Sequence, residues 1–370
     1  MRRRSITCAG WHLCRLDSSG VKAPKTLSGA VICMTYRHVW RRPGITACIG
    51  IALLTASATT SEASSVLAVG PGQRLALPSQ AAAIAKPGDV IRIAPGEYTD
   101  CAAWRASRLT IEGTGTGAVL ANKSCAGKGI FIIQGNDTTV RNLTFAHAAV
   151  PDHNGSGIRV EGHNLTVVHS RFLDNEDGIL AGDAGSGTIR IIDSEFRGNG
   201  KCDPQCAHGI YVAAIDKLDV EHSRFTDQHV GHHIKSRALS TVLIDNDIAD
   251  GPDGDSSYLV DISNGGDLLM QGNRLEKGPK SSNTGTAVSI GAEGVTHPTH
   301  ALIIRNNSFT SDLPETTVFV RNLTTTPAVL SGNHLHGRVT PLVGPGTVNP
   351  GTVNAGTGNP GTGNPGTVNP

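Results

Sequence analysis

The chain has 370 residues and a formal net charge of +1 at pH 7, with 38% hydrophobic, 17% charged and 4% aromatic residues. A balanced charge excludes the strongly basic surface of nucleic-acid-binding proteins, so we expect no nucleic-acid partner. With 45 glycines and few helix-favouring residues, the composition favours short strands joined by turns.

The first 63 residues have the features of a processed N-terminus. Residues 1–33 are a possible untranslated extension, with translation starting at Met34. From Met34, basic residues, the apolar stretch 45–56 and then small residues follow the pattern of a signal peptide. The apolar stretch is too short for a membrane span. We therefore expect residues 34–63 to be removed and the mature chain, without a membrane span, to be secreted or periplasmic; an uncleaved N-terminal anchor is the alternative.

Four cysteines follow the expected cleavage site, and an even number in an exported chain favours disulfides. Cys202 and Cys206 are close enough in the sequence for a disulfide to close one loop. A disulfide between Cys101 and Cys125 would join the first turns of the chain. A metal site is disfavoured, because no second Cys-x-x-Cys or paired histidine spacing accompanies them.

The next segment predicts a short helix followed by strands. Residues 75–85 have a helical pattern that Pro87-Gly88-Asp89 ends. Strands are expected at 90–93 and 109–113. Such a helix would cover the first layer of a stack of strands, whose open edge otherwise invites aggregation.

Residues 154–336 repeat one phrase: a short apolar strand, a Ser or Asn, one polar residue and a large apolar residue. The large apolar residues, with one earlier copy, are Phe145, Phe172, Phe196, Phe225, Ile248, Leu275, Phe309 and Leu335. The Ser/Asn column is Ser170, Ser194, Ser223, Asn246, Asn273, Asn307 and Asn333. A period of roughly 20–50 residues without helical patterning predicts a β-helix, in which one turn of the coil forms one rung. An antiparallel sandwich is disfavoured because the gaps between copies vary.

Each repeat carries a second strand upstream of the large apolar residue. Alternation along it places the middle residue outward. The predicted outward column is Arg159, Leu180, Tyr211, Lys235, Asp261, Ser289 and Phe319. The Ser/Asn residues should stack at a corner, where their side chains can bond to the backbone and to one another.

The run Pro87-Gly88-Asp89-Val90-Ile91-Arg92-Ile93, then Gly96-Glu97-Tyr98 and the repeats, resembles secreted right-handed parallel β-helix proteins of the pectate-lyase-like superfamily. The resemblance covers about residues 66–340. It implies an all-β fold, a single-stranded right-handed parallel β-helix over residues 64–340, with the short N-terminal helix as its cap. It also implies lyases, hydrolases and epimerases that act on acidic polysaccharides, and some members that only bind. The clustered Asp ligands and Arg pattern of pectate lyases are not clear enough here to carry over any catalytic residue.

The outward column predicts a candidate site where polar residues concentrate. The candidate catalytic residues are Tyr211, His233, Lys235, Arg237 and Asp261. The candidate substrate-binding residues are Arg159, His208, His232 and Glu293. The Glu293-Gly294 pair and the stretch 231–238 also resemble signatures of bacterial β-helix repeat proteins.

These residue types suit an acidic sugar. Arg and Lys would neutralise a uronate carboxylate, which lowers the barrier to removing the adjacent proton, and Tyr, His or Lys could transfer that proton. We therefore expect lyase or epimerase chemistry on an extracellular or cell-envelope polysaccharide by a monomer. Hydrolysis, which needs two carboxylates such as Asp261 with Asp255 or Glu293, is less favoured.

Two alternatives stay open. The charged residues could be ordinary cross-strand ion pairs on a solvated face. The protein could also be a non-catalytic carbohydrate-binding, matrix or adhesin-like solenoid.

No cofactor is required by this scheme, although Ca²⁺ is possible. Residues 250–255 contain three aspartates that could hold Ca²⁺, but the ligand loop is incomplete and an Asp/Gly turn is favoured. No candidate site residue is assigned to a metal.

The C-terminal residues 341–370 repeat Gly, Thr, Val, Asn and Pro with no charge. Because they have almost no large apolar residue to offset the entropy of ordering, we expect a disordered tail.

Overall fold

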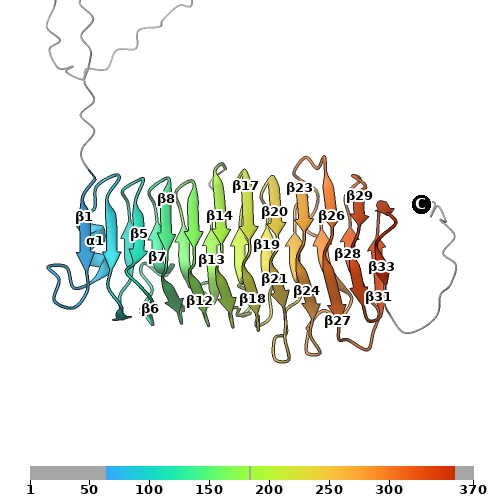
Figure 1. The fold of residues 1–370 in the computed structure, drawn as a ribbon, viewed down its shortest axis with the longest axis horizontal. Coiled ribbons are helices and arrows are strands. Elements are labelled where there is room, and N and C mark those ends of the chain that lie inside the picture. The colour runs from blue at the N-terminus through green and yellow to red at the C-terminus, as the bar shows by residue number, and fades with distance from the viewer. Residues whose placement is uncertain (1–63, 183–184, 355–370) are drawn as a thin grey trace, which may run out of the picture. The chain divides into compact units, whose positions relative to one another are not determined.

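The computed structural model describes residues 64–182 and 185–354, and these form a parallel β-helix (Figure 1). The predicted all-β solenoid is confirmed. Each full turn of the coil contributes one strand to each of three parallel sheets, named A, B and C here. Each strand pairs with the equivalent strand of the next turn, as when β11 pairs with β8 and β14.

The strands of sheet A are β1 (Val66–Val69), β2 (Val90–Ile93), β5 (Thr110–Gly113), β8 (Thr138–Arg141), β11 (Leu165–Val168), β14 (Thr188–Ile192), β17 (Lys217–Glu221), β20 (Ser240–Ile244), β23 (Asp267–Gln271), β26 (Leu302–Arg305), β29 (Ala328–Ser331) and β32 (Gly346–Val348). The strands of sheet B are β3 (Gly96–Tyr98), β6 (Ala118–Ala121), β9 (Thr144–Ala146), β12 (Arg171–Leu173), β15 (Glu195–Arg197), β18 (Arg224–Thr226), β21 (Asp247–Ala249), β24 (Arg274–Lys277), β27 (Ser308–Ser311), β30 (His334–His336) and β33 (Val353–Asn354).

The strands of sheet C are β4 (Ala102–Trp104), β7 (Gly129–Ile133), β10 (Ser156–Val160), β13 (Asp177–Ala181), β16 (Ile210–Val212), β19 (Ile234–Ser236), β22 (Val260–Ile262), β25 (Thr286–Ile290), β28 (Thr317–Asn322) and β31 (Val339–Val343). The helix α1 (Pro78–Ile84) precedes them at the N-terminal end of the stack (Figure 1). Its Ala81 is fully buried in the core, and the backbone N–H of Ser79 donates to Asp100 at 2.8 Å. The expected capping helix is therefore confirmed.

The repeated phrase of the sequence spans a corner between sheets A and B. The apolar strand belongs to sheet A, and the large apolar residue belongs to sheet B. Between them lies one residue with positive φ, such as Asp193 at 49° or Asp245 at 53°. Asp is one of the few non-glycine residue types that tolerate this left-handed conformation. The corner is therefore tight and short.

All eight predicted large apolar residues are buried on sheet B. The phenyl rings stack from rung to rung, with centroids 4.6 Å apart for Phe172 and Phe196 and 4.7 Å apart for Phe196 and Phe225. Buried apolar area of this kind stabilises the folded state by about 25 cal/mol per Å². The column thus forms a continuous core along the stack.

The Ser/Asn column also stacks as predicted. In each rung the side-chain oxygen accepts the backbone N–H of the preceding column member, as in Asn246 N–H to Asn273 Oδ1 at 2.9 Å and Ser170 N–H to Ser194 Oγ at 3.2 Å. The Asn273 amide group also donates to the carbonyl oxygen of Leu243 at 2.9 Å. These bonds satisfy buried backbone groups at the corner.

Both predicted disulfides are present, joining Cys101 to Cys125 and Cys202 to Cys206. The described residues contain no helix long and apolar enough to cross a membrane. The expected signal peptide at 34–63 and the extension before it lie outside the described residues.

The boundary at residue 340 is wrong. Strands β31, β32 and β33 continue all three sheets as far as Asn354. Backbone pairing such as Val329 with Thr347 requires an extended chain rather than large side chains, so a Gly/Thr/Val/Asn sequence can add to an existing sheet edge. The expected disordered tail is therefore wrong for residues 341–354, and residues 355–370 lie outside the described residues.

The outward column is correct except at its last member. Ser289 pairs with Arg321, not Phe319. Phe319 is fully buried and stacks on Phe309 with centroids 5.1 Å apart. Simple alternation fails in this strand because two consecutive residues, Phe319 and Val320, both pack into the core.

Replacing Asn273 by Ala should lower the free energy of unfolding by about 2–4 kcal/mol, because it leaves buried backbone N–H and C=O groups without partners. Asn273→Ser is the matched control, since Ser occupies the same column in earlier rungs and keeps the acceptor for Asn246. We expect it to lose about half as much in urea unfolding. Equal losses for both variants would contradict a role for the acceptor.

Candidate functional site

Sheet C carries the predicted site on its outer surface. The register pairs Tyr211 with Lys235, and Lys235 with Asp261, on consecutive rungs as predicted. A cleft of about 570 Å³ lies over these strands. Six of the nine predicted site residues line the cleft: His208, Tyr211, His232, Lys235, Arg237 and Glu293.

Loops between sheets B and C form the walls of the cleft. The disulfide-closed loop contributes Cys202, Gln205 and Cys206, and later loops contribute Ser257 and Ser282. These walls cover the strand surface, so the Lys235 side chain is only 11% exposed although it points away from the core.

The two cations of the cleft bind one carboxylate. Lys235 Nζ donates to Oε1 of Glu293, and the Arg237 guanidinium donates to Oε2. Burial alone would raise the pKa of Glu293, but hydrogen bonds and positive charge from Lys235 and Arg237 hold it below the usual value. Both cations also lie near the Tyr211 ring, with Lys235 Nζ 5.6 Å and Arg237 Cζ 5.2 Å from its centroid.

Asp261 lies beside Lys235 on the next rung and does not line the cleft. Its side chain is 2% exposed, and its Oδ2 lies 3.8 Å from Lys235 Nζ and 3.7 Å from His232 Nε2. The hydroxyl of Ser263 donates to the same oxygen at 2.6 Å. Burial raises the pKa of Asp261, against the lowering effects of Ser263 and Lys235. Asp261 therefore pairs with Lys235 from the neighbouring rung rather than contacting a ligand.

His208 and His232 belong to a column of hydrogen-bond acceptors at the start of the sheet C strands. Asp177 Oδ1 accepts the backbone N–H of His208 at 2.7 Å, and His208 Nδ1 accepts that of His232 at 3.0 Å. His232 Nδ1 in turn accepts the backbone N–H of Tyr258 at 3.1 Å. Because Nδ1 is an acceptor in both rings, the neutral ring carries its proton on Nε2. Each histidine can offer an N–H donor but cannot accept a proton at Nε2.

The electrostatics agree with neutral rings. Burial lowers the pKa of His208 well below its usual value and that of His232 to about 3, and the positive charge of Lys235 adds to both effects. The rings of His208 and His232 stack with centroids 4.8 Å apart, and Tyr258 continues the stack at 5.0 Å. In Asp177, burial has the opposite effect and raises the pKa to about 8.

The placement of His233 beside Lys235 is wrong. His233 is 1% exposed, and its Nε2 lies 3.0 Å from Oδ1 of the buried Asp250. Across the rungs, His233 lies between Gly209 of the preceding turn and Leu259 of the next turn. The backbone N–H of Ile210 donates to the carbonyl oxygen of His233, and the N–H of Ile234 donates to the carbonyl oxygen of Leu259. Both His233 and Ile234 are buried, so simple alternation fails at this point.

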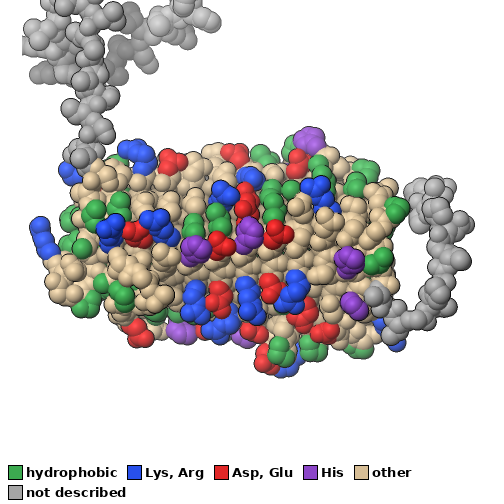
Figure 2. All heavy atoms as spheres, in the orientation of Figure 1, with side chains coloured by type: hydrophobic (Ala, Val, Ile, Leu, Met, Phe, Trp, Pro, Cys, Tyr) green, Lys and Arg blue, Asp and Glu red, His purple; other side chains and the backbone are tan. Residues whose placement is uncertain are grey.

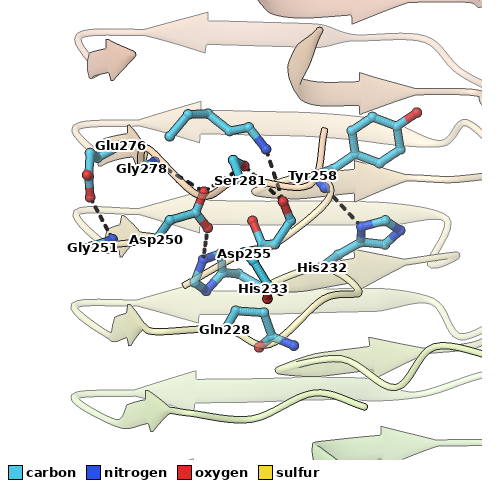
Figure 3. A network of polar contacts seen from close by, with 12 residues as sticks. Gln228, His232, His233, Asp250, Gly251, Asp255, Tyr258, Glu276, Gly278 and Ser281 are labelled. Atoms are coloured by element: carbon cyan, nitrogen blue, oxygen red, sulfur yellow. Dashed lines mark hydrogen bonds and ion pairs between the residues drawn. The ribbon is translucent and has the colours of Figure 1, made fainter. Parts of the chain in front are cut away.

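Figure 3 shows the two neighbouring histidines with separate partners: His233 contacts Asp250, and His232 accepts from the Tyr258 backbone. Asp250 also accepts a hydrogen bond from the Ser281 hydroxyl at 2.9 Å. His233 thus belongs to a buried polar network that holds the loop after β21.

Arg159 also lies outside the cleft. It pairs in register with Ile132 and Leu180, so one complete rung separates it from Tyr211. Its charge lowers the pKa of Glu161, where hydrogen bonding from Lys128 and Gln134 opposes the raising effect of burial.

Two residues near the site were not assigned to it from the sequence. Tyr258 stands two positions before Val260, as His232 stands before Ile234, and this equivalence could have placed it in the stacked column. Lys277 is fully buried and donates to the carbonyl oxygens of Ser256 and Ser257, which hold the cleft wall. Burial lowers the pKa of Lys277 to about 8. An isolated Lys at the end of a strand gives no signal of this in the sequence.

The three aspartates considered for Ca²⁺ have different partners. Asp250 binds His233 and Ser281, Asp253 pairs with Lys280 at 2.7 Å, and Asp255 accepts the backbone N–H of Val230. Within residues 64–182 and 185–354 no cluster of three or more His, Cys, Asp or Glu side chains could hold a metal ion. Residues 251–253 form a turn.

Charges elsewhere on the surface have a simpler arrangement. The face in Figure 2 shows rows of positive and negative side chains along the stack. Exposed pairs such as Arg171 with Glu195 and Arg190 with Glu221 join adjacent rungs. Exposed pairs of this kind contribute little to stability. The cleft differs in Lys235 and its neighbour Asp261, whose side chains are only 11% and 2% exposed.

Residues 98–274 match the family model described as "Right handed beta helix region". This match confirms the expected resemblance to right-handed β-helix proteins. No curated protein matches the chain by sequence.

Similar solved structures include pectate lyase Pel9A, with 13% identity over 80% of this chain and 80% of that chain and a TM-score of 0.44. The pectin methylesterase PemA from Erwinia chrysanthemi has 12% identity over 76% and 81% of the two chains, with a TM-score of 0.35. A GH87 alpha-1,3-glucanase from Streptomyces thermodiastaticus strain HF3-3 has 14% identity over 76% and 64%, with a TM-score of 0.37. At these identities no residue role is transferred to this chain.

Lowering the pH should destabilise the wild type relative to His232→Asn. The Asn oxygen can replace Nδ1 as the acceptor for Tyr258 but does not titrate. Because the folded-state pKa of His232 is about 3 and the unfolded value is about 6.5, the unfolded chain binds more protons between these values, and stability falls as the pH falls. The wild type should lose about 2 kcal/mol relative to the variant between about pH 6.5 and 5. Parallel pH profiles in urea unfolding would refute the neutral acceptor role.

Proposed function

We propose that the cleft over sheet C binds an acidic polysaccharide and that its chemistry is lyase or epimerase type, with proton removal next to a uronate carboxylate. The observation that carries this proposal is that Lys235 and Arg237 direct their N–H groups at one carboxylate, that of Glu293, inside the cleft. Paired cationic donors of this kind suit a carboxylate ligand. His208 and His232, whose neutral rings carry a proton on Nε2, also line the cleft.

Roles within the cleft follow from the hydrogen bonds. Lys235 and Arg237 would neutralise the uronate carboxylate and so stabilise the negative charge that develops when the neighbouring proton leaves. Since His208 and His232 can only donate, Tyr211 remains as the candidate residue that could accept this proton, and the Lys235 ammonium could only donate one. Hydrolysis is disfavoured because Asp261, expected as one of its two carboxylates, is 2% exposed and does not line the cleft.

Binding without catalysis is the second candidate. It is favoured by the acceptor column, because both histidines use Nδ1 to hold the backbone and neither is available as a base. The same cleft would then act as a carbohydrate-binding surface of an envelope or matrix protein.

We further propose that the protein works outside the cytoplasm, secreted or periplasmic. The two disulfides support this location, since disulfides persist in oxidising compartments. The signal-peptide pattern at residues 34–63 agrees with it.

Binding should be tested by calorimetry with polygalacturonate, alginate and hyaluronate, and with neutral dextran as the reference. Lys235→Gln and Arg237→Gln should each weaken acidic-polysaccharide binding about tenfold or more, because each removes a charge-assisted hydrogen bond. Arg190→Gln, on sheet A and paired with Glu221, is the matched control and should bind as the wild type does.

The same samples should be followed by ultraviolet absorbance for unsaturated uronate products and by NMR for epimerised residues. Product formation that is lost in Lys235→Gln would support catalysis. Binding without product would favour the second candidate, and the absence of binding to every acidic polymer would contradict both.

A further inference from the structure

We propose that Glu293 occupies the carboxylate subsite of the unliganded cleft and that an acidic sugar binds by replacing it. Glu293 is then a specificity-determining residue, because only a ligand that brings its own carboxylate can take over both cations. This inference rests on the proposed function of the cleft and assigns the subsite within it.

The exposed fractions of the three charged side chains indicate that the Glu293 carboxylate can be exchanged for that of a ligand. The Glu293 side chain is 38% exposed, its partner Lys235 is 11% exposed, and Asp261, which pairs in register with Lys235 on the next rung, is 2% exposed. A ligand entering from solvent would therefore meet Glu293 first. Asp261 would stay in place and keep the Lys235 ammonium oriented toward the cleft.

The position of Glu293 in the coil distinguishes it from the ordinary charge rows. On the exposed faces, ion pairs join adjacent rungs. Glu293 follows β25, whose Ser289 pairs with Asp261, so it reaches over the rung of Asp261 to contact Lys235 and Arg237 two rungs away. Ion pairing between charged residues of adjacent rungs does not by itself produce this contact.

The turn that carries Glu293 is fixed by its backbone. The N–H of Glu293 donates to the carbonyl of Ser263 at 2.9 Å, and that of Gly294 donates to Gly291 at 3.1 Å. Gly291 and Gly294 have φ of 85° and 94°, which other residues rarely adopt. The Asn264 amide also donates to the carbonyl of Gly294 at 3.2 Å. The backbone can therefore stay in place while the exposed side chain rotates into solvent.

An acidic sugar and a neutral sugar would leave Lys235 and Arg237 in different states after replacing the Glu293 carboxylate. A uronate carboxylate would restore two charge-assisted hydrogen bonds, so the exchange leaves both cations paired. A neutral sugar in the same place would leave Lys235 and Arg237 without a partner in a partly dehydrated cleft, which is costly. Competition by Glu293 thus lowers the affinity for acidic ligands and excludes neutral ones from this subsite.

The test compares wild type with Glu293→Gln, which keeps the shape of the side chain and removes its charge. The probes are oligogalacturonate, oligomannuronate and oligoguluronate of defined length, each with its methyl ester as the matched neutral ligand, measured by calorimetry. We expect Glu293→Gln to bind the preferred acid about tenfold more tightly, with no comparable gain for its ester. Glu293→Ala should change affinity in the same direction and provides a second variant if Glu293→Gln folds poorly. Glu221→Gln, an exposed carboxylate on sheet A, should leave affinity unchanged.

The outcomes separate this inference from the proposed function. If the wild type binds an acidic probe and both Glu293 variants bind it equally or more weakly, Glu293 is an ordinary binding or structural residue and the inference is overturned while the function stands. If neither the wild type nor the variants bind any acidic probe, the proposed function fails and this inference with it. An equal gain for acid and ester would also overturn the inference, because it would indicate a steric rather than a charge effect.

Discussion

Parallel pairing between equivalent strands of successive turns is the constraint on which this structure depends. Once β11 pairs with β14, every residue of one rung lies beside its counterpart in the next. Position in the repeat therefore decides position in space. The stacked phenyl rings, the Ser/Asn column and the acceptor column of Asp177, His208 and His232 all follow from this pairing, because each repeats one kind of contact at equivalent positions of successive rungs.

Most of the fold could be predicted because its signals are periodic. The spacing of the large apolar residues identified sheet B, and alternation correctly placed Tyr211, Lys235 and Asp261 on the outer surface. The prediction failed where a local irregularity breaks the period, as at His233 and Phe319, which point inward beside another buried residue.

Other features depend on information that periodicity does not contain. The burial of Lys235 depends on loops whose lengths vary, and the contact with Glu293 joins residues 58 positions apart. The strands at residues 341–354 form because an existing sheet edge offers backbone partners, although their own side chains provide little apolar area. Composition alone therefore underestimated the order of this segment.

The two kinds of corner in the coil also have unequal freedom to change. The corner between sheets A and B is confined to a left-handed residue and a Ser or Asn that bonds to the neighbouring rungs, so an insertion there would interrupt the stack. The middle parts of the loops between sheets B and C, such as residues 200–206 and 251–257, lie outside the Ser/Asn and acceptor columns and contribute to the cleft walls. Natural variation or protein engineering could exchange those loops, and with them the ligand accommodated, on an unaltered scaffold. The cleft loops can therefore change while the stacked rungs that carry them stay the same.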